Sequence, residues 1–493
     1  MIVKKDIIRK DVISITLPIL AEQVFIVLMG TVNTVMAGHI NNEAFSAIGM
    51  VNSINNIFIA FFSAIAIGST VVVANNVGRN RISEANETAK QAVASGFLLS
   101  VAITALIWIF RIPMVNVLFG AADPRIINDS FIYLGITLLT YPLISVTSVA
   151  CGLLRGAGDT RTPAAVSIFM NVANVILSYV LIFGIDIHTA LFSIKFGSMG
   201  VVGAALGIAI ARVLGALIIM YTLLKGSKVI KIDRFFPLRF DMRIQRFIYG
   251  IGVPSSVESL MFNAGKLITQ VFIVGMGTVA IAANQVAGTI GAFINVPGIA
   301  FSISVTTLVG QSMGRGDVKG AKSTMAYMTV LSSVCLLAIS IVLYPLAGPL
   351  SSIFINSSNV SGEITSMSAS VIRLLAIVTP IFWSTGFLIP AGLKGAGDVK
   401  YTLVTAVASM WLIRITMGYI LGVPLKMGVA GIWLGMYMDW VIRSILYLVR
   451  LKNEKWKYRM IGKGSKGNGI NDIKDINDIN EDTEGSNPVF PTI

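Results

Sequence analysis

Charged side chains are scarce in this 493-residue chain. Asp, Glu, Lys and Arg together make up 13% of it, whereas roughly a quarter of an average soluble domain is charged. Hydrophobic residues make up 55%, and apolar runs nearly free of charge recur between residues 12 and 449. About 20 helical residues span the hydrocarbon layer of a bilayer. The composition therefore predicts an all-α integral membrane protein and excludes an ordinary soluble domain.

Cysteine and histidine are nearly absent. The chain has two cysteines, Cys151 and Cys335, in or beside apolar runs, and two histidines, His39 and His188, in predicted loops. A disulfide framework or a zinc site needs a cluster of such residues, and neither can be built from these four. The chain also lacks the Gly-x-x-x-x-Gly-Lys-Ser/Thr loop that cradles phosphates. We expect no enzymatic activity, no cofactor and no ATP-driven pump within this chain.

Twelve predicted spans account for the apolar runs. The four basic residues near the N-terminus precede a first run that is too long for a signal peptide, so we expect it to stay in the protein. The spans are placed at residues 12–37, 48–74, 91–110, 130–152, 162–184, 200–223, 247–275, 279–309, 324–347, 367–391, 401–422 and 428–449.

Lys and Arg gather in alternate loops. With the N-terminus in the cytoplasm, 29 of the 38 lie in the N-terminal segment, the cytoplasmic loops and the tail. The opposite side has only Arg111, Arg125, Lys195 and Lys426. By the positive-inside rule, this predicts a multi-pass protein of the cell membrane with both termini cytoplasmic. The net charge of +14 therefore reports orientation in the lipid bilayer, and nucleic acid is not expected as a partner.

Short motifs recur in order in the two halves of the chain, which predicts two copies of a six-helix unit. Because six is even, both copies cross the membrane in the same sense, as parallel repeats of secondary transporters do. The pairs are Pro18 and Glu22 with Pro254 and Glu258, Gly78-Arg79 with Gly314-Arg315, residues 156–159 with 395–398, and residues 199–201 with 427–429.

The repeat divides the chain into an N-lobe (1–223), a basic linker (224–246), a C-lobe (247–450) and a disordered cytoplasmic tail (451–493). Two lobes that enclose a central cleft can open alternately to either side of a membrane. We expect a single chain to act as a monomer. Energy would come from an ion gradient.

Two carboxylates interrupt the spans at equivalent depths. Glu22 and Glu258 lie about eleven residues, or ~16 Å, into their helices, near the bilayer midplane. Each could bind a coupling proton or cation, or stay protonated in an interhelical hydrogen bond. We favour a functional role for Glu258. Pro18 and Pro254 lie one turn earlier and are predicted hinges, because proline breaks the helical hydrogen-bond ladder.

Other polar residues of the spans are candidates for the substrate cleft. Lys266 could meet a charged substrate or bridge two helices. Asp439 and Arg443, spaced i, i+4, more simply form a local ion pair. The residues assigned to the cleft are Lys266, Asn171, Asn284, Gln285 and Asp439. No function is assigned to Arg212, Arg373 and Arg414.

Four segments carry a resemblance to a known family. They are residues 32–40 (VNTVMAGHI), residues 152–163 (GLLRGAGDTRTP), the pair Asn171 and Asn174, and residues 392–398. Over residues 10–450, the sequence resembles the multidrug and toxic compound extrusion (MATE) family. The resemblance implies a MATE-like fold of twelve helices. It also implies export of amphipathic, often cationic, small organic compounds in exchange for Na⁺ or H⁺.

The resemblance further implies a cation-coupling site made of Glu258, Glu22, Asn33, Asn174 and Ser178. Many family members carry carboxylates where this chain has Asn33 and Ser178, and some carry an aspartate in the tenth helix that is missing here. A Na⁺ site, if present, is therefore expected at Glu258. The polar stripe of Asn174 and its neighbours could coordinate a cation or join helices. A flippase for a lipid-linked glycan or peptidoglycan precursor is the alternative function.

Overall fold

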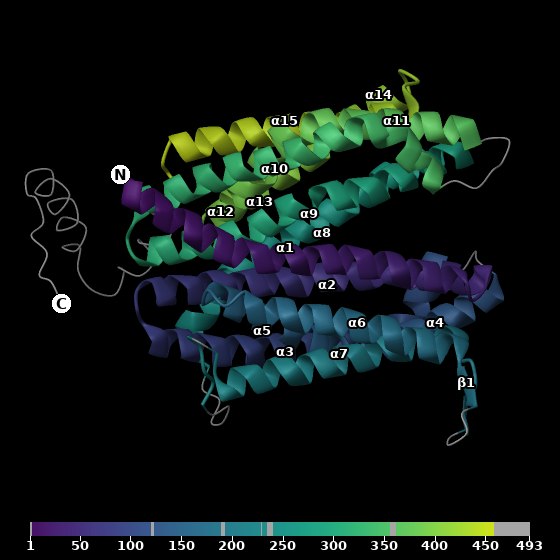
Figure 1. The fold of residues 1–493 in the computed structure, drawn as a ribbon, viewed down its shortest axis with the longest axis horizontal. Helices are drawn as coiled ribbons and strands as arrows, with labels where there is room; N and C mark the ends of the chain where they lie inside the picture. The colour runs from purple at the N-terminus through teal and green to yellow at the C-terminus, as the bar shows by residue number, and fades with distance from the viewer. Residues whose placement is uncertain are drawn as a thin grey trace, which may run out of the picture.

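The computed structural model describes residues 2–119, 123–188, 193–227, 229–233, 240–354 and 361–457. Long helices run lengthwise beside one another (Figure 1). Eleven helices of the described chain are long and apolar enough to cross a membrane. The helices α4 and α5, bent by 47° at a short break, are together long and apolar enough to be a twelfth. These agree with the twelve predicted spans.

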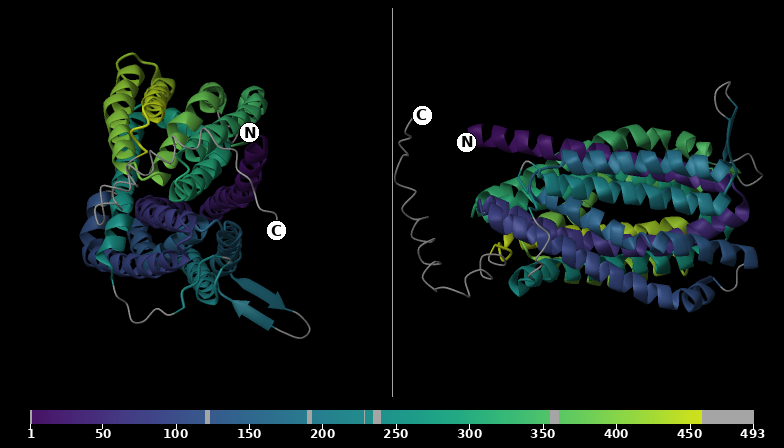
Figure 2. Two further views of the ribbon diagram at one scale, coloured as in Figure 1. Left: turned by 90° about the vertical axis from the view of Figure 1, so that its left-hand side faces the viewer. Right: turned by 90° about the horizontal axis from the view of Figure 1, so that it is seen from below.

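The first half of the chain contributes seven helices and one hairpin of two antiparallel strands. The hairpin lies between α6 and α7, projects beyond the helices (Figure 2) and was not predicted. The elements are α1 (Ile2–Gly38), α2 (Asn42–Gly78), α3 (Ile82–Phe119), α4 (Pro124–Leu138), α5 (Tyr141–Gly156), α6 (Arg161–Phe183), β1 (Ile185–His188), β2 (Ser193–Phe196) and α7 (Gly200–Lys225).

The second half has no strand among its described residues and contains two π-helical segments, η1 and η2. π-Helical turns are rare and frequent at functional sites. The elements are α8 (Met242–Val274), α9 (Thr278–Gly314), α10 (Val318–Ile353), α11 (Ser361–Val378), η1 (Thr379–Leu388), α12 (Ile389–Gly395), α13 (Val399–Ser409), η2 (Met410–Ile415), α14 (Thr416–Gly422) and α15 (Gly428–Lys452).

Most helices are longer than the predicted spans, because hydropathy marks only the apolar part of a helix. α10 begins at Val318, where the side chain of Asp317 caps its N-terminus by accepting a hydrogen bond from the amide of Gly320 at 2.7 Å. The side chain of Asp241 caps α8 in the same way. Capped polar turns of this kind extend helices beyond the apolar run.

The turns repeat as the sequence motifs do. Gly158 (φ 91°) and Gly397 (φ 83°) occupy left-handed positions after α5 and α12, where glycine avoids the steric cost of a side chain. Gly200 (φ 54°) and Gly428 (φ 61°) do so as the first residues of α7 and α15. Equivalent backbone conformations at equivalent sequence positions support the internal repeat.

The two halves touch closely at one end of the bundle. There α2 and α9 lie backbone to backbone: a Cβ atom on Gly78 would lie 2.2 Å from the carbonyl oxygen of Gln311, and one on Gly314 would lie 2.2 Å from that of Asn75. Nε2 of Gln311 also donates to the carbonyl of Gly156 at 3.0 Å. Glycines allow this approach because any side chain would prevent it. We call this the closed end.

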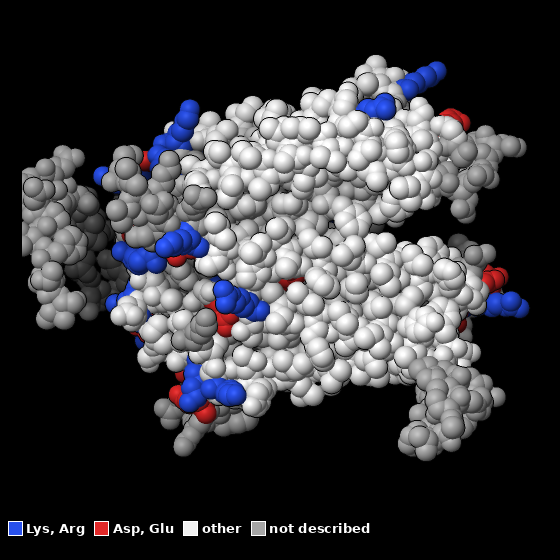
Figure 3. Space-filling model, in the orientation of Figure 1, with Lys and Arg blue, Asp and Glu red and all other residues white. Residues whose placement is uncertain are grey.

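The opposite end is open. Figure 3 shows a groove between the two halves at the end away from the N-terminus. The middle of the visible face is almost free of charged residues, and Lys and Arg gather mainly at the closed end (Figure 3). α1 begins and α15 finishes at that closed end (Figure 1). This arrangement fits an even number of spans.

The predicted tail begins too early. α15 continues to Lys452, and the side chain of Trp456 is fully buried, so the chain remains packed to at least this residue. Glu454 pairs with Lys322 at 2.8 Å and with Lys457. Hydrogen bonds from both lysines lower the pKa of Glu454 to about 2. The rest of the predicted tail, residues 458–493, lies outside the described residues.

The predicted hinge prolines lie inside uninterrupted helices. α1 runs through Pro18 and α8 runs through Pro254 without a break in either helix. The described helical chain changes its geometry elsewhere, at the bend between α4 and α5 and at η1 and η2. A hinge at either proline therefore stays a prediction about motion.

Candidate functional site

A cavity of about 680 Å³ lies between the two halves. Helices α1, α2, α5, α6 and α7 line it from one half, and α9, η1 and α12 line it from the other. The charged side chains that reach it are Glu22, Arg155, Arg212 and Lys394. Trp383 of η1 and many aliphatic side chains complete the wall. A largely apolar cavity of this size with a few polar groups can hold a drug-sized molecule.

The charge and both carboxylate oxygens of Glu22 are compensated by neighbouring side chains. Nη2 of Arg155 donates to its Oε1 at 2.6 Å and to its Oε2 at 2.7 Å, and the hydroxyl of Ser167 donates to Oε1 at 2.7 Å. The Glu22 side chain is only 2% exposed. Both oxygens and the charge are satisfied by these partners, so this carboxylate has little capacity left for a further cation.

The carboxylate of Glu258 has a partner for only one of its two oxygens. Nζ of Lys394 donates to its Oε1 at 2.8 Å, whereas its buried Oε2 has no hydrogen-bond partner in the described chain. Glu258 lines a second cavity of about 270 Å³. Phe387, Ala391 and Lys394 line both cavities. A buried oxygen without a partner is a place where a proton or a small cation gains an interaction.

The two ion pairs are related by the internal repeat. Glu258 follows Glu22 by 236 residues, and Lys394 follows Arg155 by 239. Each cation lies in the last turn of a helix, one residue before a glycine. The asymmetry has a simple origin, because the residue that corresponds to Ser167 is Ala406, which has no hydroxyl to donate. The sequence thus makes the C-lobe carboxylate the more available of the two.

The polar residues predicted for the coupling site do not all face the cavity; those of the predicted span 162–184 lie on α6. Asn33, Asn171 and Asn174 line the main cavity. Ser178 does not: it is 4% exposed and donates to Oδ1 of Asn174 at 3.1 Å. A Cβ atom on Gly207 would come within 2.4 Å of its hydroxyl, so Ser178 lies against α7. Three amides therefore face the cavity, and the hydroxyl supports one of them.

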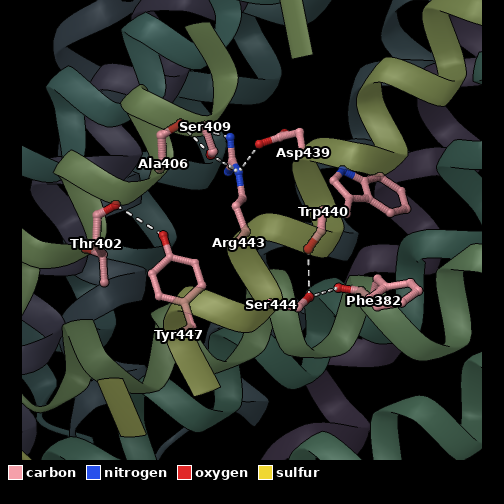
Figure 4. Close-up of polar contacts among 9 residues, drawn as sticks. All are labelled: Phe382, Thr402, Ala406, Ser409, Asp439, Trp440, Arg443, Ser444 and Tyr447. Atoms are coloured by element: carbon pink, nitrogen blue, oxygen red, sulfur yellow. Dashed lines mark hydrogen bonds and ion pairs between the residues drawn. The ribbon is translucent and has the colours of Figure 1, made fainter. Parts of the chain in front are cut away.

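Asp439 forms the local ion pair that its spacing from Arg443 favours. Nε of Arg443 donates to Oδ1 of Asp439 at 2.7 Å and to the hydroxyl of Ser409 at 2.8 Å, and Nη2 donates to the carbonyl of Ala406 at 3.0 Å (Figure 4). Asp439 is fully buried. The structure therefore places Asp439 in a packed junction of α15 with α13, and it is not among the residues that line either described cavity.

Replacement of Asp439 should destabilise the protein. The Asp439→Asn variant keeps the shape of the side chain but leaves the buried Arg443 guanidinium unpaired, which costs about 3–5 kcal/mol of unfolding free energy. Thermal unfolding of the purified protein in detergent measures the loss. The matched control, Glu363→Gln, removes an exposed carboxylate and should change stability by no more than about 0.5 kcal/mol. Equal melting of both variants would contradict the structural role.

Three other residues assigned to the cleft, Asn284, Gln285 and Lys266, line neither described cavity. Asn284 connects helices: its Nδ2 donates to Gln270 at 3.1 Å, and it accepts from Nε1 of Trp433 at 2.9 Å. Its neighbour Gln285 is exposed and lines neither cavity. Lys266 is exposed, and its Nζ lies 4.9 Å from the ring centre of Phe262. Of these three, Lys266 alone adjoins a cavity residue, since Phe262 lines the second cavity.

The family of the chain follows from comparison with known proteins. The MatE profile matches residues 18–180 and 254–420, one segment in each half of the chain. The chain belongs to the MatE (multidrug and toxic compound extrusion) family. This is a family of transporters and not of enzymes.

Relatives match this MatE member over nearly their whole length. The "Probable multidrug resistance protein NorM" of Thermotoga maritima is 27% identical over 456 residues, 92% of this chain and 94% of the relative. The "Uncharacterized transporter YisQ" of Bacillus subtilis is 28% identical over 448 residues, 90% and 94% of the two chains.

Solved structures share its fold. A MOP superfamily transporter from Pyrococcus furiosus, described as having a binding pocket of reverse polarity that suggests a different function, matches with a TM-score of 0.83 and 19% identity over 92% of this chain and 97% of that one. A multidrug resistance MATE family transporter in an outward-facing conformation matches with a TM-score of 0.81 and 20% identity, over 91% and 96%.

Sequence reasoning missed the partners of both carboxylates in this MatE transporter. Arg155 and Lys394 were counted as loop charges that set orientation, although they recur at nearly the same offset as Glu22 and Glu258. That shared offset was the available signal. Arg212 of α7 had no assignment, and no sequence pattern indicated that its Nη1 donates to the hydroxyl of Thr140, in the bend between α4 and α5, at 2.7 Å.

Proposed function

We propose that this MatE transporter is a secondary active multidrug efflux antiporter. It would export amphipathic organic compounds in exchange for Na⁺ or H⁺ by alternating access. The observation that carries the proposal is Glu258, an ion-paired carboxylate with a free buried oxygen beside a drug-sized cavity between two repeated halves. The names of relatives, including the multidrug resistance protein MdtK of Yersinia pestis, support the substrate class.

The path from the coupling ion to the substrate runs through η1 and α12. A proton or Na⁺ at Glu258 would weaken its pair with Lys394, which lies on α12. Phe387 of η1, two residues before the start of α12, lines both cavities. Movement of α12 would therefore shift an aromatic wall of the substrate cavity, lower its affinity and release the substrate. A π-helical segment is suited to this, since its hydrogen bonding is less regular than that of an α-helix.

Transport measurements in vesicles test this function. Purified protein is placed in vesicles loaded with a fluorescent amphipathic dye, and a pH gradient and a Na⁺ gradient are imposed separately. We expect dye efflux under one of the two gradients and none without a gradient. Drug-independent rescue of cell-envelope synthesis, with no dye efflux under either gradient, would instead favour the flippase.

The orientation is a further testable proposal. The closed end carries the start of α1, the finish of α15 and most Lys and Arg, so by the positive-inside rule it faces the cytoplasm. The groove would then open to the outside. In a background without Cys151 and Cys335, single cysteines at Glu363 and His188 should react with an impermeant maleimide in whole cells. Cysteines at Asp398 and Arg234, the latter outside the described residues, should not; external labelling there would contradict the orientation.

A further inference from the structure

Positive charge exceeds negative charge in the interior of the bundle. The carboxylates in or beside the cavities are Glu22, Glu258 and Asp439, and each is paired with one cation. Three further cations have no carboxylate within ion-pair distance in the described chain: the buried Arg212 and Arg414, and the exposed Lys266. Unpaired charges in a membrane interior are costly, and they commonly mark a pathway or a binding site.

Two of these cations meet at one aromatic ring. Lys266 of α8 and Arg414 of η2 lie 4.9 and 5.6 Å from the ring centre of Phe262, and the already paired Arg443 lies at 5.5 Å. The attraction of one ring face for a cation is weak compared with that of a carboxylate, and a single ring cannot compensate three cations. Asp439 supplies a single negative charge to this group. We call Lys266, Arg414, Arg443 and Asp439, gathered around Phe262, the cationic cluster. This cluster keeps an excess of positive charge.

Several hydrogen-bond donors in and beside the cluster have no acceptor in the described chain. Arg414 is 8% exposed, its Nε has no hydrogen-bond partner, and no other described group accepts from its guanidinium. Lys266 has no acceptor for its Nζ among the described residues and is exposed. The buried hydroxyl of Tyr437 and Nε1 of Trp440, on α15 beside Asp439, also lack partners. Buried donors in native proteins are nearly always satisfied, so the buried donors of Arg414, Tyr437 and Trp440 leave room for an acceptor from outside the chain, although Oδ2 of Asp439 also lacks a partner.

The cluster adjoins the cavities. Phe262 lines the second cavity and lies edge to face with Phe387 at 6.4 Å between ring centres, and Phe387 lines the main cavity as well. Phe387 in turn meets Trp440 at 5.7 Å. An amphipathic molecule could place its apolar body against these rings with a charged group beyond Phe262.

We propose that the substrates of this transporter are amphipathic organic anions, whose carboxylate, sulfonate or phosphate is bound by Lys266 and Arg414. This inference rests on the proposed efflux function and replaces the cationic substrates that the family resemblance implied. An anion supplies negative charge to a cluster that has one carboxylate for three cations, whereas a cation would add to the existing excess of positive charge. Guanidinium binds oxyanions through two parallel hydrogen bonds, and lysine adds a mobile charge.

Equilibrium binding to the purified protein tests the site without any gradient. The probes are 5-carboxyfluorescein, an amphipathic anion, and ethidium, a cation, each followed by fluorescence anisotropy. Wild type should bind carboxyfluorescein more tightly than ethidium. Lys266→Met, at an exposed position, and Arg414→Gln should each weaken carboxyfluorescein binding by roughly tenfold or more, the effect of losing one hydrogen bond to a charged group.

The controls separate the site from general charge and from folding. Arg125→Gln removes an exposed arginine that is not in the cluster and should leave both affinities unchanged. Lys266→Glu, at the same exposed position, should reverse the preference in favour of ethidium even if Arg414→Gln fails to fold. Tighter binding of ethidium by wild type, or an unaltered affinity in Lys266→Met, would overturn the proposal. Binding of the anion without transport under any gradient would contradict the antiport proposal and leave the anion site standing.

Discussion

The Glu258→Gln variant is expected to fold and to lose gradient-driven efflux. Glutamine keeps the size of the side chain and can still accept a hydrogen bond from Lys394, but it can neither bind a proton nor attract Na⁺. The pair it disrupts is 15% and 17% exposed, so Lys394 would be left as a largely buried and uncompensated charge. We expect efflux to fall by at least about tenfold, equivalent to ~1.4 kcal/mol or more.

Efflux at matched expression, under each gradient that drives wild type, measures this effect. The control is Glu22→Gln at the repeat-related position, where Arg155 and Ser167 already satisfy the carboxylate, and a smaller loss is expected. Asn33→Asp, which adds a carboxylate to the main cavity, should alter the preferred coupling ion or its affinity. Near-normal efflux by Glu258→Gln would remove this residue from the coupling mechanism.

Adding a methyl group to each of the two glycines at the closed end, Gly78 and Gly314, is expected to stop transport as well. In Gly78→Ala and Gly314→Ala the new Cβ atom would lie 2.2 Å from a backbone carbonyl oxygen of the facing helix, closer than any real contact, so α2 and α9 would have to separate. Backbone cannot swing aside as a flexible side chain does. The arrangement closed at this end would be destabilised, and the double variant should show less than about a tenth of wild-type efflux if separation costs ~1.4 kcal/mol or more.

The matched control is Gly250→Ala on α8, where nothing lies within 4 Å of an added Cβ atom. It should transport normally. A reporter cysteine at Ser302, which lines the main cavity, gives a second measurement in a background without Cys151 and Cys335. In the Gly78→Ala/Gly314→Ala protein, labelling of this cysteine from outside should slow. Undiminished labelling and efflux would mean that the closed end is not a gate.

The sequence could predict the number and placement of the spans, because a bilayer allows few backbone structures. Apolar runs of span length must be helices, since the backbone has no water to bond with in hydrocarbon. The repeat and the asymmetric loop charges are likewise properties of the linear chain. The bend between α4 and α5, the π-helical segments and the hairpin were not foreseen, because each depends on local hydrogen bonding that hydropathy does not record.

The sequence could not predict which charged residues on different helices form ion pairs. Glu22 and Arg155 are 133 residues apart, and Glu258 and Lys394 are 136 apart, so no local rule links them. Asp439 and Arg443 differ, because i, i+4 spacing on one helix brings side chains together. Sequence alone therefore identified the carboxylates and the local pair of Asp439 with Arg443.

The sequence by itself determined twelve apolar spans, two repeated halves and the positions of the buried charges. Only the tertiary structure decided which charges are neutralised: Arg155 and Ser167 satisfy Glu22, Lys394 leaves one oxygen of Glu258 free, and Lys266 and Arg414 stay without a carboxylate. The physical reason is that the free energy of a buried charge depends on atoms within a few ångströms of it. Helix packing sets those distances, and the order of residues along the chain does not.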